Sequence, residues 1–125
     1  MIMDLFKKLT IIIPDDVLEK LEIHSKNQKV QEFYFRLMEL EEILETTDFL
    51  SSIEVYQNII PLWTDDNSNY IGFHFQGACT YKISYLNHEE TDLSPGFRSI
   101  NSFITELELH PNLDWDELGK TTLLD

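Results

Sequence analysis

Residues Asp65–Asn69 (DDNSN) carry the oxygen-bearing side chains that a calcium-binding loop needs at its first three ligand positions. The calcium signature then fails, because Tyr70 stands at its glycine position and Gln76 at its bidentate glutamate position. A turn between two strands, held by hydrogen bonds from side chains to the backbone, explains the same residues. We therefore expect a turn here and no metal ion.

The segment that starts at His88 (HEETD) begins like a zinc-protease signature. Asp92 stands where the second zinc-binding histidine is required, and Pro95 follows closely. The pattern therefore predicts a loop, whereas the zinc-protease signature requires its two histidines on a helix. We expect no zinc site, and we expect Glu89, Glu90 and Asp92 to form a solvated acidic loop.

Cys79 could act as a nucleophile with His74 or His88 as its base. No third orienting group or oxyanion hole accompanies this pair, and a lone cysteine is most often a small buried apolar residue. The four glycines are scattered, so no phosphate-binding loop is expected. We expect no catalytic residue, no cofactor and no enzymatic activity.

The acidic residues of segment 40–50 are a stronger signal. Glu41 and Glu45 lie four residues apart, and Glu45 and Asp48 lie three apart, with no cation among them. On a helix such like-charged neighbours cost about 0.2–0.5 kcal/mol per pair, although the helix dipole offsets part of this for Glu41 and Glu42 near the N-terminal end. Two interpretations stay open: a face charged only for solubility, and a surface that binds a basic partner.

The whole chain, like segment 40–50, carries a negative net charge. The 125 residues contain 23 acidic and nine basic side chains, for a net charge of -14. Residues 1–36 are balanced, so the entire excess falls in residues 37–125, which hold 17 acidic and three basic side chains. Nucleic acids and anionic membranes are bound mainly through Lys and Arg, so we expect neither as a partner.

The single cysteine, Cys79, excludes an internal disulfide and fits a reducing compartment. No apolar stretch reaches the roughly 20 residues of a membrane span, and the first residues lack the pattern of a signal peptide. We therefore expect a cytoplasmic location.

The spacing of apolar residues predicts the elements that position these groups. Helices are expected at 5–9, 15–24, 40–50 and 99–110, the last capped by Ser99, with a loop at 25–29. Strands are expected at 33–38, 53–56, 58–63, 70–75 and 81–86, the last two forming an antiparallel hairpin. This order predicts a single α+β domain over residues 1–125, with a largely antiparallel sheet and helices packed on one face.

Four blocks of the sequence carry a family pattern: IPLWTDDNSNYIG (60–72), YLNHEETDLSP (85–95), FRSINSFI (97–104) and FRLMELEEIL (35–44). Over roughly residues 33–104 the chain resembles bacterial members of the SUKH superfamily, relatives of the yeast cell-wall-assembly and killer-toxin-resistance regulator. One departure is that Ser25–Gln28 replaces the Asn-Gly turn expected after the early helix.

The resemblance implies a non-enzymatic α+β module that binds proteins, often as an immunity factor encoded beside a toxin whose active domain is frequently a nuclease. It transfers no catalytic residue. We expect the chain to neutralise a cognate toxin with a basic surface; the alternative is a regulatory scaffold or small-ligand-binding module. From charge alone, the expected partner contacts are Glu41, Glu42, Glu45, Asp48, Asp65, Asp66, Glu89, Glu90 and Asp92.

Overall fold

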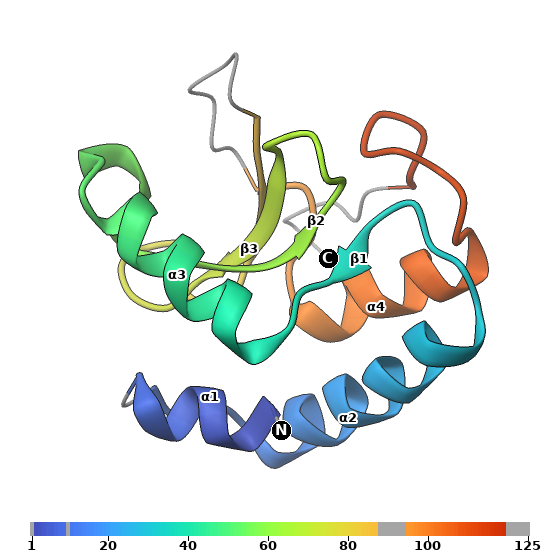
Figure 1. Ribbon diagram of the computed structural model, residues 1–125, viewed down its shortest axis with the longest axis horizontal. Helices are drawn as coiled ribbons and strands as arrows, with labels where there is room; N and C mark the ends of the chain where they lie inside the picture. The colour runs from blue at the N-terminus through green and yellow to red at the C-terminus, as the bar shows by residue number, and fades with distance from the viewer. Residues whose placement is uncertain (1, 10, 88–94, 120–125) are drawn as a thin grey trace.

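The computed structural model describes residues 2–9, 11–87 and 95–119 (Figure 1). Within these residues helices and a four-stranded antiparallel sheet form one α+β domain, which confirms the expected fold class. The elements are, in chain order, α1 (Ile2–Lys8), α2 (Asp15–Val30), β1 (Arg36–Leu37), α3 (Leu40–Ser51), the 3-10 turn η1 (Glu54–Tyr56), β2 (Ile59–Thr64), β3 (Tyr70–His74), β4 (Ile83–Leu86) and α4 (Ile100–Leu109).

The strands lie in the order β1-β2-β3-β4, and each neighbouring pair is antiparallel. The expected hairpin forms between β3 and β4, with Phe73 opposite Ile83. An irregularity between Pro61 and Trp63 shifts the β2–β3 register by one residue. Gly72 is required opposite Pro61, because a Cβ atom there would lie 2.5 Å from the carbonyl oxygen of Ile60.

The larger core lies on the face of the sheet that carries Phe73 and Trp63. Phe6 of α1 packs edge-on against Phe73, with ring centroids 5.9 Å apart. Phe103 of α4 packs against Trp63 in the same way at 4.7 Å. Figure 1 shows α1 and α2 side by side below the sheet, with α4 between α2 and the strands. Three of the helices therefore cover one face, as expected.

Helix α3 differs from this arrangement. Its Leu50 forms a second, smaller cluster with Ile59 and Leu86. Strand neighbours alternate between faces, so Leu86, three residues after Ile83, points away from the larger core. The expectation that all helices pack on one face is wrong for the C-terminal part of α3. Because side chains pack on both faces of the sheet, β2 is buried along its whole length.

Helix α2 continues through residues 25–29, where the sequence predicted a loop. The polar side chains there have partners that are distant in the chain: the amide of Gln28 donates to the carbonyl oxygen of Phe35 at 3.1 Å, and the amide of Asn27 donates to Glu108. These contacts favour the helix, and no local pattern reveals them.

Two predicted strands are also revised. Residues 54–56 form η1, because turn hydrogen bonds from Ile53 to Leu50 and from Tyr56 to Ile53 continue the coil after α3. The strand expected at 33–38 is reduced to β1, because the amide of Tyr34 donates to the carbonyl oxygen of Pro111 at 2.7 Å and leaves the sheet.

A buried polar cluster joins α2, β2 and α4 around His24, whose side chain is fully buried. The indole of Trp63 can only donate, so Nε2 of His24 accepts its hydrogen bond at 3.1 Å. The ring proton therefore sits on Nδ1, which donates to the carboxylate of Glu108 at 3.1 Å. Burial lowers the pKa of His24, although the neighbouring Glu108 opposes this.

Among the described helices, none combines the length and the apolar composition needed to cross a bilayer.

Candidate functional site

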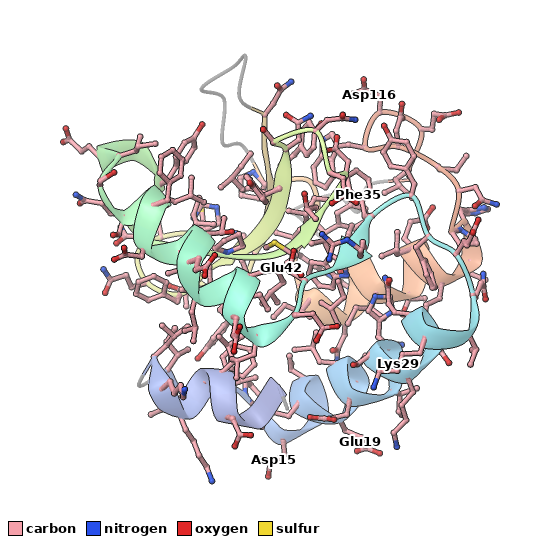
Figure 2. All side chains as sticks on the ribbon, in the orientation of Figure 1. Asp15, Glu19, Lys29, Phe35, Glu42 and Asp116 are labelled. Atoms are coloured by element: carbon pink, nitrogen blue, oxygen red, sulfur yellow. The ribbon has the colours of Figure 1, made fainter. Side chains whose placement is uncertain are left out.

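The N-terminal end of α3 is built by two glutamates. Glu39 caps the helix, and its backbone amide donates to Oε1 of Glu42 at 3.0 Å while its own side chain accepts from the backbone of Glu42. This reciprocal capping box fixes where the helix begins. It also holds the Glu42 carboxylate close to the backbone, beside β1 (Figure 2).

The outward face of α3 carries three of the predicted contact residues. Glu41, Glu45 and Asp48 are all exposed, and none of them has an ion-pair partner among the residues that the structure describes. Phe49 is 64% exposed and lies four residues after Glu45, on the same face. The face is therefore acidic with one projecting aromatic ring.

Glu42 and Asp66 differ from this group because Arg36 binds both. The guanidinium of Arg36 donates two parallel hydrogen bonds to Glu42, at 2.9 and 3.0 Å, and two to Asp66, at 2.8 and 3.3 Å. These hydrogen bonds lower the pKa of both carboxylates. Glu42 therefore has a cation partner, unlike Glu41, Glu45 and Asp48, which the sequence left without one.

A crevice of about 280 Å³ opens between α3 and the turn after β2. Its charged lining consists of three carboxylates and one guanidinium, so its net charge is negative. The structure thus brings Glu45 of the helix and Asp66 of the turn into one site, which sequence spacing alone did not predict. The lining residues are Arg36, Met38, Glu42, Glu45, Thr46, Thr64, Asp66, Ser68 and Tyr70.

The turn itself forms as predicted. Asp65 accepts hydrogen bonds from the backbone of Asn67 at 2.8 Å and from the side-chain amide of Asn69 at 2.9 Å. The hydroxyl of Thr64 accepts from the backbone of Asp66 at 3.0 Å, while Asp66 and Ser68 have positive φ angles of 65°. The carboxylate of Asp65 therefore holds the turn together in addition to adding charge at its surface.

In the described ranges no group of three or more His, Cys, Asp and Glu side chains is arranged to hold a metal ion. His74, considered as a base for Cys79, instead pairs through Nε2 with the hydroxyl of Ser84 at 2.8 Å, and burial lowers its pKa. Cys79 lies in the turn between β3 and β4, where its carbonyl oxygen accepts from the amide of Lys82.

His88 and the predicted contacts Glu89, Glu90 and Asp92 lie outside the described residues. Sequence reasoning missed Arg36 as the organiser of the crevice. A signal for it exists, since Arg36 is the last basic residue before Lys82, at the edge of the acidic part of the chain.

Comparison with known proteins adds no relative: no family model matches the chain, and neither the curated proteins nor the solved structures contain a match.

Proposed function

We propose that this chain is a non-enzymatic protein-binding domain of the immunity type, which neutralises a cognate bacterial toxin by binding its basic surface. The toxin class expected from this chemistry is a nuclease, because a nuclease must attract phosphates and so presents cations. The observation that carries the proposal is the uncompensated acidic face of α3, which adjoins the negatively charged crevice. The sequence resemblance to the SUKH superfamily supports the same function.

Helix α3 lacks the lysines that balance the acidic residues of the two earlier helices. Helices α1 and α2 have acids in the first turn and bases in the last, as the helix dipole favours. In α2, Asp16 and Glu22 each have a lysine four residues later. Helix α3 has no base in its last turn, and its exposed acids repel one another. A face that weakens its own helix is expected where the charge serves binding.

The exposed ring of Phe49 suits the same role, because protein interfaces gain most of their affinity from a few aromatic and arginine anchors surrounded by polar residues. In the crevice, Arg36 is paired with Glu42 and Asp66. Glu45 lines the same crevice and can bind a basic side chain of the partner. Long-range attraction between the two surfaces would raise the association rate toward about 10⁸–10⁹ M⁻¹s⁻¹ at low salt.

The test co-expresses this chain with the product of the toxin gene expected beside its own and scores co-purification and rescue of growth. The double variant Glu41→Lys/Glu45→Lys changes the net charge from -14 to -10. The matched control, Asp15→Lys/Glu19→Lys, makes the same change on the exposed side of α2, away from Glu42 (Figure 2). We expect the α3 variant to associate with the toxin at least tenfold more slowly at low salt and to fail to rescue growth.

The α2 control should stay within threefold of the wild type. Equal effects of both variants would show that only the total charge matters and would reject α3 as the binding face. A wild-type chain that neither co-purifies with the toxin nor rescues growth would reject the immunity function.

A second candidate function is a small-ligand-binding module. It is favoured by another crevice of about 300 Å³ where α1, α2, β1 and α3 meet. Leu5, Leu40 and Ile43 give it an apolar floor, and Lys29 and Glu22 lie at its polar rim. This volume is at the lower limit for ligand pockets. Failure of toxin binding together with a ligand-induced rise in Tm that Leu40→Arg abolishes would favour this candidate.

A further inference from the structure

Three aromatic side chains from distant parts of the chain meet beside the β2–β3 turn. Tyr34, two residues before β1, is 44% exposed, while Tyr85 of β4 and Trp115 of the C-terminal segment are half-buried. Tyr85 and Trp115 stack with ring centroids 5.3 Å apart and an interplanar angle of 13°. Phe35 lies beneath them, edge-on to Tyr34 at 4.9 Å and to Tyr85 at 6.2 Å. These contacts give the surface rings a rigid base.

Carboxylates surround these rings. The backbone amide of Glu117 donates to Asp114 at 3.0 Å, and the amide of Asp114 donates back to Glu117 at 3.3 Å, so both side chains are held beside Trp115. Asp116 is exposed on the same segment, and its charge acts on Tyr85. We call the three rings with Asp65, Asp114, Asp116 and Glu117 the aromatic–acidic patch.

The field of the carboxylates reaches the phenols. Burial, and then the charge of Asp65, raise the pKa of Tyr34. Burial together with the charges of Asp65 and Asp114, among others, raises the pKa of Tyr85 to about 12. Negative potential at an aromatic surface disfavours anions and favours a cation. A guanidinium satisfies such a surface best, because it stacks on rings and donates to carboxylates at once.

The patch adjoins the acidic crevice through one short turn. Asp65, at the edge of the patch, precedes Asp66, which lines the crevice. Arg36 pairs with Thr64 in the sheet, which places β1 between Tyr34 and the crevice. We propose that the aromatic–acidic patch is a second contact for the same basic protein partner and receives one of its arginine side chains over Tyr34. This inference rests on the proposed function and adds an anchor to it.

The first experiment measures the affinity of the wild-type chain and its variants for the co-expressed toxin. We expect Tyr34→Ala to raise the Kd at least tenfold, whereas Tyr34→Phe, which keeps the ring, stays within threefold. Asp116→Arg leaves every ring in place but puts a cation into the patch, and it should also raise the Kd at least tenfold. Circular dichroism and Tm show whether each variant folds. If Tyr34→Ala does not fold, Asp116→Arg still tests the proposal.

The second experiment uses a hexa-arginine peptide as the probe and follows tryptophan fluorescence, since Trp115 lies in the patch and Trp63 is buried in the core. Toxin binding that both Tyr34→Ala and Asp116→Arg leave within twofold of the wild type overturns this inference but leaves the proposed function standing. Peptide binding that Asp116→Arg abolishes, without any toxin binding, supports the patch and rejects the immunity function. Binding of neither partner rejects both.

Discussion

At the scale of single residues, His24 is the one titratable side chain among the described residues that is fully buried. It can accept from Trp63 only while it is neutral. A second proton would break this hydrogen bond and bury a charge, which Glu108 offsets only in part. His24 therefore ties α2 to β2 and α4 as a neutral imidazole, and this state depends on pH.

Acid should therefore destabilise the fold before the carboxylates titrate. The pKa of His24 is below 6.5 in the folded chain and close to 6.5 in the unfolded chain, so the unfolded state binds more protons in between. The stabilisation is complete above pH 6.5 and is lost as the pH falls, by at most about 1.4 kcal/mol per pH unit. Urea unfolding at pH 7.5, 6.5 and 5.5 measures this loss.

His24→Gln is the matched variant, because the amide oxygen of glutamine can accept a hydrogen bond but does not titrate. We expect it to be less stable than the wild type at pH 7.5 and to lose less stability on acidification. His74, whose pKa burial also lowers, contributes in the same direction, so His74→Gln is measured in parallel. A wild-type chain equally stable at pH 7.5 and 5.5 would contradict this account.

At the scale of elements, local patterns predicted what local forces determine. In α4, Ser99 accepts from the amide of Ser102 at 3.0 Å, and Ile100, Phe103, Ile104 and Leu107 are all buried, as their spacing indicated. The β3–β4 hairpin and the turn at Asp65 also follow from neighbouring residues. The exposure of Glu41, Glu45 and Asp48 on one face of α3 was predictable for the same reason.

What depends on distant partners was not predictable. The helical position of Gln28 is favoured by the hydrogen bond from its side chain to the carbonyl oxygen of Phe35. Strand β1 is short because the backbone amide of Tyr34 donates to Pro111. The pairing of Arg36 with Asp66 requires the β1–β2 register, which places Arg36 opposite Thr64. No period in the sequence encodes that register, so the crevice and the aromatic–acidic patch emerge only in three dimensions.

Helix α3 yields a prediction in which stability and binding change in opposite directions. Glu45→Lys removes the repulsion from Glu41 and Asp48 and creates two attractive pairs, with Glu41 in the favoured position four residues before the lysine. We expect the free energy of unfolding to rise by roughly 0.5–1 kcal/mol in low salt. Association with the basic partner should become slower.

Chemical unfolding and stopped-flow association with the toxin measure these two effects on the same protein. Glu45→Gln is the control, because it removes repulsion without adding a cation and should give about half of each effect. If Glu45→Lys made the chain less stable while leaving association unchanged, Glu45 would serve the fold, and the assignment of α3 as the binding face would be wrong.

At the scale of the whole molecule, a net charge of -14 acts on the free chain and on the complex with opposite sign. In the free chain the excess carboxylates repel one another, so added salt screens repulsion and should raise the Tm. In the encounter with a basic partner the same carboxylates attract, so added salt should slow association. The repulsion within the chain and the attraction to the partner both weaken as the screening length falls from about 30 Å at 0.01 M to about 8 Å at 0.15 M ionic strength.

We therefore expect the Tm of the free chain to rise between 0.01 and 0.15 M NaCl while the association rate constant with the toxin falls at least tenfold. The Glu41→Lys/Glu45→Lys variant should show a smaller change in both quantities. The Asp15→Lys/Glu19→Lys control has the same net charge, so its Tm should rise with salt by about as much as that of the variant, whereas its association should stay salt-sensitive. An acidity that serves only solubility would raise the Tm with salt and leave association equally salt-dependent in both variants, so the comparison separates a charged surface from a binding face.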